Sequence, residues 1–556
     1  MKSRWRLLFN GLILGSLLLS SRGVIAQCGF TSVGRGRVLT YTFDPEVISA
    51  GTILHITLRF GGGPEGTERI EVPADWAGQT MHAVKYLRAL SPDTSISDTA
   101  TPDAATIRYR QNGEVALTYD LVKDWTGPLV YPFQFHPVLM PNYLEINGAN
   151  ALVHPKLEAR SLVTSNFDWQ KLPTDWALAT SFGTTAGPEG RCQSYSGPWR
   201  AVETALFAAG EFRIHHFQIA SQPAVLAVRG QWTFTDEEAV ADIQKAVSIV
   251  RDFWHDHNFP YFLVTLKPYD IGKGSSDGSE FTNAFWMYLS PPDSISALLP
   301  VLAHETFHGW NPRRMGYTTG GTETSLKWFS EGFTQYYGYL LSYRSGLMTL
   351  PAYLERINGY LRDYAKSTDP DVRGPVIALW LDGEIRRESQ GEHSLDNVMF
   401  DMVRKGKDTE LTEARILETA DRYLSADVRR QLGQAIEPGA MIPVPDASAL
   451  GACVRVSIDR VPVFVLGFDF EASMAAHRVT AVKEDGPAFK AGLRDGQELN
   501  GWSVYNNQPD RLATFHIDTA MGHQTIQYYP RETTTAPQYH LDQRAFADDP
   551  AACQRH

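Results

Sequence analysis

The sequence is poor in cysteine, with only four in 556 residues. A chain of this length with so few cysteines is not a small scaffold built on disulfide bonds. Charged residues make up 21% and hydrophobic residues 43%, which excludes a collagen, a long coiled coil and wholesale disorder. We therefore expect a globular protein of roughly two to four domains.

Positive charge is also scarce. The chain has 51 Lys and Arg against 63 Asp and Glu, a formal net charge of -12. Nucleic-acid binding draws on clustered basic side chains that neutralise phosphates. We therefore expect no nucleic-acid partner.

Long apolar runs are missing after the N-terminus, so no transmembrane helix is expected there. Residues 1–26 combine a basic start, an apolar core and small residues before the expected cleavage point at Ala26, which predicts a cleaved signal peptide. The core is shorter than the roughly 20 residues that a membrane anchor needs. A lipoprotein anchor at Cys28 is disfavoured because Gln27 precedes it. We expect an exported protein, periplasmic or secreted, without a stable membrane anchor.

Export would remove four basic and no acidic residues, which takes the net charge from -12 to -16. It would also place the cysteines in an oxidising compartment, where four cysteines allow three pairings. Cys453 and Cys553 bracket the C-terminal segment, so a bridge between them would join its two ends. That pairing would leave Cys28 with Cys192.

The chain divides by local pattern. Residues 27–160 contain alternating β-branched and aromatic runs separated by Gly-rich turns, which predicts a β-rich, sandwich-like domain. From about residue 235 helical periodicity dominates, as in 236–253, where apolar residues recur near 3.6 spacing. A Pro/Gly-rich linker at 437–445 precedes a return to short strands. The pattern favours a multidomain α+β protein.

The sharpest motif is His304-Glu305-Thr306-Phe307-His308. On a helix, positions i and i+4 share a face, so both imidazoles can bind one zinc ion. Glu305 would then lie beside the water that the ion activates, as a catalytic base. The motif alone is incomplete, because a zinc site of this kind needs a third protein ligand.

The segment Trp328-Phe-Ser-Glu331-Gly-Phe-Thr334 predicts a second helix with a buried aromatic face. The aromatic side chains are explained by core packing. Glu331 is different, because a carboxylate in an apolar helix needs a partner, and a zinc ion would be one. Three protein ligands would leave a fourth position open, which is typical of a catalytic site. We expect one zinc ion bound by His304, His308 and Glu331.

These segments resemble a known family. Residues 304–314, HETFHGWNPRR, are similar to the zinc helix of the M61 glycyl aminopeptidases, and 328–334 and 391–399 (GEHSLDNVM) resemble further stretches of that family. The resemblance implies a mainly helical, thermolysin-like zinc peptidase domain over 161–445. It also implies peptide substrates with a free N-terminus and a preference for small first residues.

The resemblance extends to substrate binding. In the family a Gly-x-Glu strand holds the substrate amine, and Glu280, which lies 24 residues before His304, is the matching position. The family residue that follows is His, whereas here it is Phe281. The family also has an oxyanion-binding Tyr in a Tyr-x-Lys-Gly stretch. Here the stretch is Asp371-Val-Arg-Gly374, which leaves Tyr364 nearby as a candidate donor.

Residues 446–556 resemble a PDZ domain. Val465-Leu-Gly-Phe468 is similar to the carboxylate-binding loop, and 485–496 (DGPAFKAGLRDG) is similar to the strand and helix that follow. The resemblance implies a groove that takes the C-terminus of a peptide. The alternative is a degenerate module that only packs on the catalytic domain, since Val465 replaces the usual first glycine.

The sequence therefore predicts an exported zinc aminopeptidase. Two alternatives stay open: a peptide-binding protein whose peptidase domain is degenerate, favoured by Asp371, and a zinc endopeptidase with the same chemistry.

Overall fold

The computed structural model describes most of the chain after the N-terminal segment. Among the described residues, no helix is both long enough and apolar enough to cross a membrane. The predicted signal peptide, 1–26, lies outside the described residues. The described ranges are 28–30, 36–97, 102–129, 132–185, 191–259, 261–269, 276–290, 295, 298–318, 322–364, 367–406, 409–444, 447–451, 453–505, 508–519, 522–549 and 553.

The chain forms two compact units. The first comprises Met1–Trp125, Phe135–Leu178 and Thr185–Thr204, and the second comprises Thr126–Gln134, Ala179–Thr184 and Ala205–His556. The mixed α+β, multidomain class predicted from the sequence is confirmed.

Among its described residues, the first unit contains a six-stranded and a four-stranded β-sheet. The larger has the strand order β16-β13-β1-β2-β9-β6 and the smaller has the order β12-β3-β8-β7. Side chains along β1 alternate between buried and half-buried, which is the pattern of a strand with one face on a core. The strands are β1 (Arg37–Ile48), β2 (Gly51–Gly61), β3 (Thr67–Glu71), β6 (Val84–Ala89), β7 (Ser95–Ser97), β8 (Ala104–Arg108), β9 (Glu114–Leu121), β12 (His154–Pro155), β13 (Leu162–Trp169) and β16 (Cys192–Pro198).

The first unit continues past residue 160, where the sequence pattern places the domain boundary. Strand β13 pairs in parallel with β1, from Arg37 opposite Val163 to Phe43 opposite Trp169. Strand β16 then pairs with β13. A parallel partner comes from a distant part of the chain, so local pattern does not reveal it. The disulfide Cys28–Cys192 lies in this unit and confirms that pairing.

The second unit contains a mixed sheet with the strand order β18-β19-β20-β22-β21. Its strands are β18 (Arg213–Ile219), β19 (Gln222–Val228), β20 (Phe262–Pro268), β21 (Ser276–Phe281) and β22 (Ala284–Leu289). Strand β21 is at the edge and pairs on one side with β22, antiparallel. Among the described residues no strand pairs with its other side, and an edge of this kind can take up an extended ligand.

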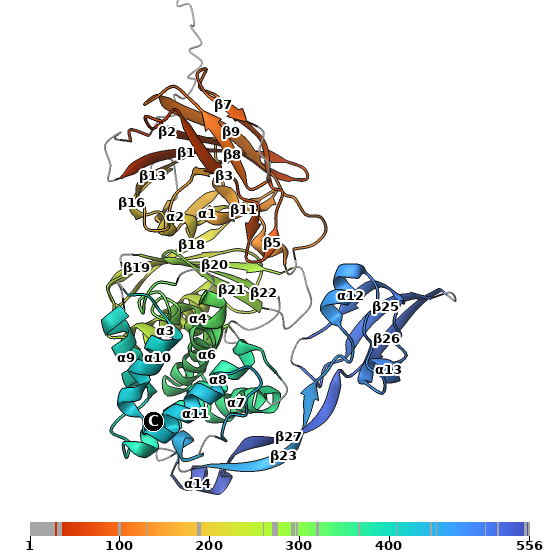
Figure 1. The fold of residues 1–556 in the computed structure, drawn as a ribbon. Coiled ribbons are helices and arrows are strands. Elements are labelled where there is room, and N and C mark those ends of the chain that lie inside the picture. The colour runs from red at the N-terminus through yellow and green to blue at the C-terminus, as the bar shows by residue number, and fades with distance from the viewer. Residues whose placement is uncertain are drawn as a thin grey trace, which may run out of the picture. The chain divides into compact units, whose positions relative to one another are not determined.

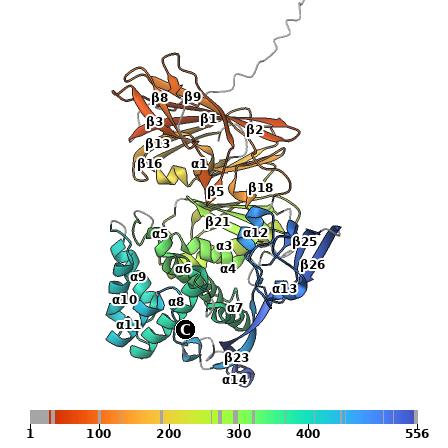
Figure 2. The same ribbon diagram turned by 45° about the vertical axis from the view of Figure 1, so that its right-hand side comes forward.

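Helices α3 (Asp236–Phe253) and α4 (Leu299–Phe307) cover one face of this sheet (Figures 1 and 2). The bounds predicted for the first of them are confirmed, and Thr235 begins it with a capping box to Glu238. The helices that follow α4 form a second, larger core. They are α5 (Thr322–Ser325), α6 (Lys327–Arg344), α7 (Leu350–Asp363), α8 (Pro370–Glu388), α9 (Leu395–Gly406), α10 (Glu413–Ala420) and α11 (Ala426–Ala435).

Helix α6 is central to that core, and α8 crosses it closely. An ideal Cβ on Gly332 would lie 2.3 Å from the Cα of Gly374. Both positions therefore need glycine, because any side chain would push the two helices apart. Since Gly332 follows Glu331, this contact holds the first turns of α6 and α8 together.

A buried polar network connects α6 to the neighbouring helices α8 and α9. The Asp382 carboxylate, 4% exposed, accepts hydrogen bonds from Tyr336 Oη at 3.0 Å, Arg386 Nε at 3.0 Å and the Leu395 backbone N–H at 2.8 Å. It therefore joins α6, α8 and the start of α9. Removing a buried carboxylate that accepts three hydrogen bonds leaves its donors without an acceptor, which lowers the stability of the folded protein.

We expect Asp382→Ala to lower the free energy of unfolding by about 3 kcal/mol, because it leaves the buried Tyr336 hydroxyl, the Leu395 N–H and the half-buried Arg386 guanidinium without their shared acceptor. Denaturant titration followed by circular dichroism measures this change. Asp427→Ala is the matched control, since Asp427 pairs with Arg430 on the surface, where both side chains are largely exposed. Equal stability of the two variants would contradict the role of the network.

The C-terminal part contains a long two-stranded ribbon of β23 (Val454–Phe464) and β27 (Arg531–Leu541), drawn in blue in Figure 1. Between these strands lie α12 (Phe470–Ala476), α13 (Pro487–Ala491) and a sheet of β24 (Glu498–Ser503), β25 (Ala513–Thr519) and β26 (Gly522–Tyr528). They share a small core around Leu493 and Phe515. The PDZ-like assignment of this part stays a prediction.

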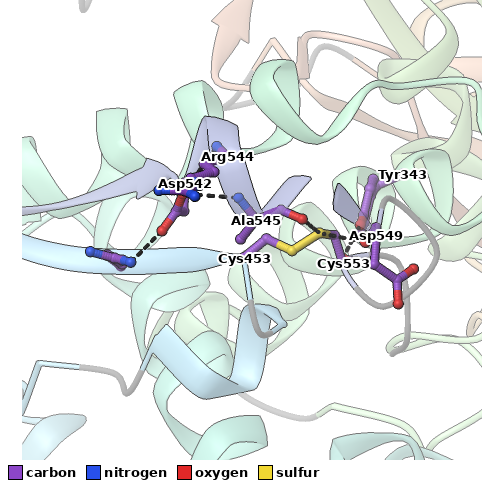
Figure 3. The surroundings of a disulfide bond; sticks show 8 residues. Tyr343, Cys453, Asp542, Arg544, Ala545, Asp549 and Cys553 are labelled. Carbon is purple, nitrogen blue, oxygen red and sulfur yellow. Dashed lines mark hydrogen bonds and ion pairs between the residues drawn. A yellow bond between two sulfur atoms is a disulfide. The ribbon is translucent and has the colours of Figure 1, made fainter. Parts of the chain in front are cut away.

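The second disulfide, Cys453–Cys553, confirms the predicted staple (Figure 3). Helix α14 (Gln543–Asp548) lies between β27 and Cys553, and Asp542 caps it by accepting from the backbone N–H of Arg544 and Ala545. The Tyr343 hydroxyl, in the last turn of α6, donates to the Cys553 carbonyl at 3.1 Å. The staple therefore attaches the end of the chain to the helix that carries Glu331.

Candidate metal centre and active site

Three of the predicted site residues meet at one point. His304 lies on α4, His308 forms its C-cap one turn later, and Glu331 lies in the first turns of α6. The two Nε2 atoms are 3.1 Å apart. Glu331 Oε2 lies 3.7 Å from His304 Nε2 and 3.3 Å from His308 Nε2. The structure thus brings all three predicted ligands together.

Close helix packing creates this arrangement. An ideal Cβ on Gly338 would lie 3.1 Å from the His304 Cβ, so α6 approaches α4 to backbone distance. Beside this contact the rings of Phe307 and Tyr337 stack with centroids 4.9 Å apart. The aromatic face of α6, predicted as core packing, is buried and presses the two ligand-bearing helices together.

The donor set fits a zinc ion. Zinc binds nitrogen and carboxylate oxygen at about 2.0–2.2 Å in tetrahedral geometry, which puts ligand atoms about 3.3 Å apart. The three separations of 3.1, 3.3 and 3.7 Å scatter around that value. Two imidazoles and one carboxylate also form a set that leaves one zinc position open.

His308 is oriented by a backbone carbonyl. Its Nδ1 lies 2.9 Å from the Asn311 oxygen and donates a proton to it, so Nε2 is the ring nitrogen that remains to bind a metal. The Asn311 side chain is fully buried and donates to the Phe329 carbonyl and to Thr334 Oγ1, both at 3.1 Å. Asn311 therefore connects the histidine to the helix of Glu331.

We expect Asn311→Ala to weaken zinc binding about ten-fold or more, because the carbonyl that orients His308 would lose its anchor on α6. Competition with a chromophoric chelator measures the zinc affinity. Asn397→Ala on α9 is the control, since Asn397 accepts from the Ser394 N–H within its own helix start. An unchanged zinc affinity in a folded Asn311→Ala protein would contradict this role.

The pKa values of the four central side chains are shifted in different directions: His304, Glu305, His308 and Glu331. Burial favours the neutral form of His304 and lowers its pKa to about 4. Burial also opposes charge on His308, but the hydrogen bond and charge of Glu331 outweigh it and raise its pKa to about 9. Burial alone would raise the pKa of Glu331, yet its hydrogen bonds to both histidines bring it well below the usual range. Glu331 is therefore ionised and ready to bind a cation.

Glu305 faces a different environment. Burial raises the pKa of its carboxyl to about 8, against the positive charge of His308. Nearby carboxylates act in the same direction as burial: Glu280, Glu331 and Asp277. A carboxylate with a raised pKa is a stronger base than an exposed one, which suits proton transfer near neutral pH.

Glu280 lies beside the zinc helix, at the edge strand β21. An ideal Cβ on Gly309, the residue after His308, would lie 3.8 Å from Glu280 Oε1. The Glu280 side chain is 15% exposed, and Arg313 Nη1 lies 3.4 Å from the same oxygen. The structure thus brings Glu280 into the candidate site, next to an edge strand that can pair with an extended peptide.

Sequence reasoning missed three residues of this site. Gln134 Nε2 donates to Asp277 Oδ2 at 2.6 Å, and the Asp277 backbone lies on β21 close to Glu280. Arg313 pairs with Glu280 as described. Arg313 follows the zinc motif by only five residues, so its position in 304–314 was a usable signal. Gln134 is 143 residues away from Asp277, and no local pattern indicates that they meet.

The oxyanion position differs from the family pattern. Asp371 lies in the first turn of α8 and is close enough to Glu331 for its charge to act on the Asp371 pKa, which burial above all raises. The Tyr364 hydroxyl donates to the Ile442 carbonyl at 3.3 Å and is buried in the helical core. Tyr364 thus has a backbone partner, and its role as a donor to substrate stays a prediction.

Comparison with known proteins agrees with this geometry. Residues 297–376, which contain His304, His308 and Glu331, match the M61 glycyl aminopeptidase family model. A solved aminopeptidase N family protein from Idiomarina loihiensis aligns with a TM-score of 0.66 at 16% identity, covering 91% of this chain and 98% of that chain. An M1 zinc metallopeptidase from Deinococcus radiodurans aligns with a TM-score of 0.48 at 13% identity, over 74% and 94%. A search of curated proteins gave no match.

The likeness to the Idiomarina protein shows a shared fold over nearly the whole of both chains. The family match covers the segment in which all three predicted metal ligands lie. The family match supports a metallo-aminopeptidase. The chain is therefore a peptidase in which residues 297–376 are similar to the M61 glycyl aminopeptidases.

Proposed function

We propose that this protein is an exported, zinc-dependent aminopeptidase that removes the first residue of peptides and prefers Gly or Ala at that position. The observation that carries the proposal is the Glu280 carboxylate beside the His308 end of the zinc helix. A carboxylate beside the metal ligands can bind the α-ammonium of a peptide by charge-assisted hydrogen bonds. The resemblance to the M61 glycyl aminopeptidases supports the proposed preference for small residues.

His304, His308 and Glu331 would hold the metal, which would supply polarisation of the scissile carbonyl and acidification of a water molecule. Glu305 accepts a proton from the attacking water and passes it to the leaving amine. Glu280 orients the N-terminus, and the free edge of β21 aligns the first peptide group. The buried helices around the motif exclude bulk water from the buried carboxylates.

Export is part of the proposal. It is supported by the basic and apolar pattern of residues 1–26 and by the two disulfides, Cys28–Cys192 and Cys453–Cys553. We also propose that the loop Val465–Phe468 takes a peptide C-terminus, on the strength of its resemblance to PDZ domains. A cavity of about 520 Å³ opens beside that loop.

A second candidate function is peptide binding without catalysis. Asp371 favours it, because a carboxylate stabilises an oxyanion only when protonated. A third is endopeptidase activity with the same zinc chemistry.

One experiment separates the three. The zinc-loaded protein is incubated with Ala- and Gly-initiated peptides, each with a free or an acetylated N-terminus, and the products are identified by mass spectrometry. We expect release of the first residue from free peptides alone. Cleavage of acetylated peptides would favour the endopeptidase, and binding without cleavage would favour the degenerate peptidase.

A further inference from the structure

A cavity of about 420 Å³ lies along α6 and α7 in the second unit, and we call it the distal cavity. It is defined here by residues of α6, α7, the start of α8 and the segment 508–511. Those that matter for its chemistry are Tyr339, Arg356, Tyr360, Val372 and Arg511. No predicted site residue belongs to it.

The distal cavity and the metal centre lie along the same helix, α6. Glu331, Gln335 and Tyr339 are spaced by four residues and are half-buried, whereas the residues between them are buried. They therefore form one half-buried stripe on a single face of the helix. Eight residues at 1.5 Å each separate Glu331 from Tyr339 by about 12 Å.

Helix α8 gives a second connection. Asp371 is within electrostatic reach of Glu331 on one side and of Tyr360 on the other. Val372, the next residue, lines the distal cavity. Residues of two helices, α6 and α8, thus lie near the metal centre at one point and line the distal cavity at another.

Within the part of the chain that the structure describes, two guanidinium groups of the cavity form no ion pair. Arg356 lies over the Tyr339 ring at 5.8 Å and Arg511 over the Tyr505 ring at 4.4 Å, and within the described ranges neither forms an ion pair. The acidic lining residues Asp363 and Asp510 are already paired, with Arg362 and Arg531. The lining holds three basic and three acidic residues. Within the same ranges Glu355 is the one lining carboxylate without a cation, so two unpaired guanidinium groups stand beside one unpaired carboxylate.

We propose that the distal cavity binds the C-terminal carboxylate of a short peptide whose N-terminus lies at the metal centre, with Arg356 and Arg511 as the recognising groups. Guanidinium groups bind carboxylates in a bidentate, charge-assisted geometry, and they can do so while they stack on tyrosine rings. This inference rests on the proposed function. It adds to that function a substrate class, namely short peptides with a free C-terminus.

The distance sets the length of the substrate. An extended peptide advances about 3.3 Å per residue. A span of about 12 Å plus the residues held at either end corresponds to four or five residues. Longer peptides would carry their carboxylate past the cavity, so the preference is for this length.

The test compares alanine pentapeptides that end in a free acid or an amide. Binding is measured by calorimetry on the zinc-loaded Glu305→Gln protein, and hydrolysis by kcat/KM on the active protein, normalised to an alanyl anilide in each variant. We expect the acid to bind about ten-fold or more tightly than the amide. In Arg356→Gln/Arg511→Gln the acid-to-amide ratio should fall toward one. Arg430→Gln on α11 is the matched control and should keep the ratio of the unmodified protein.

The outcomes separate the two proposals. If neither peptide nor the anilide is hydrolysed but the acid still binds more tightly through the two arginines, the aminopeptidase is refuted and the carboxylate site stands. If acid and amide bind equally, or if the double variant keeps the full ratio, the carboxylate site is refuted whatever the activity. The acid and the amide are also measured with an acetylated N-terminus. If both then bind as tightly as before and keep the same acid-to-amide ratio, the connection to the metal centre is refuted.

Discussion

Replacing Glu305 with glutamine is expected to abolish peptide hydrolysis, lowering kcat by about 10²–10⁴-fold. Glutamine keeps the size of the side chain but cannot accept the proton of the attacking water. Glu305 is not among the three groups that converge as metal ligands, so zinc should stay bound. The measurement is release of aniline from alanyl anilide, together with zinc content by mass spectrometry.

Glu413→Gln is the control for the glutamate substitution, because Glu413 lies exposed in the first turn of α10. It should retain full activity. A Glu305→Gln protein that turns over substrate at the unmodified rate would remove Glu305 from the mechanism. Loss of zinc together with activity would instead show that Glu305 supports the metal ligands.

Replacing Asp371 with tyrosine is expected to increase kcat by about 10²–10³-fold, the size of effect that a single oxyanion donor provides. The resemblance to the M61 family places a tyrosine at this position. The structure places Asp371 in the first turn of α8, within electrostatic reach of Glu331. A hydroxyl there would donate to the developing negative charge, whereas an ionised carboxylate repels it.

Asp371→Phe is the matched control, since it adds the ring without the hydroxyl. We expect the phenylalanine variant to stay close to the unmodified protein, and the gain of the tyrosine variant to appear in kcat more than in KM. Equal activity of the two aromatic variants would show that the acidic charge, and not a missing donor, limits the rate. No gain in either would mean that another group already serves the oxyanion.

The two substitutions test opposite sides of the same question. Glu305→Gln tests whether the protein hydrolyses peptides by the chemistry that the motif predicts. Asp371→Tyr tests whether a missing oxyanion donor limits the rate of that hydrolysis. A protein that responds to both is an active aminopeptidase limited by a lost donor. A protein that responds to neither is better explained as a peptide-binding relative.

Much of the metal centre could be predicted because it depends on local geometry. His304 and His308 share a helix face by their spacing alone. Glu331 stood out because a carboxylate in an apolar helix needs a partner. The pairing of Cys453 with Cys553 followed from their position at the two ends of one segment, and Cys28 and Cys192 were then the remaining pair. Each of these inferences uses neighbours in the sequence or the pairing rule of cysteines.

The surroundings of the centre could not be predicted in the same way. The boundary near residue 160 was hidden because β13 joins the first sheet by parallel pairing with β1. Tyr364 was selected for its nearness to Asp371 in the sequence, yet its hydroxyl has a backbone partner at Ile442. Nearness along a chain does not fix where a helical side chain points, since each residue turns about 100° from the last.

The sequence by itself determined the zinc-binding pattern, the candidate base and the order of β-rich, helical and strand-rich segments, because each depends on residues a few positions apart. Only the tertiary structure decided that Gln134 meets Asp277, that Arg313 meets Glu280 and that Asn311 joins His308 to α6. It also decided that the guanidinium groups of Arg356 and Arg511 line one cavity. These contacts arise from helix and strand packing across long sequence separations, where the positions of side chains depend on the whole core.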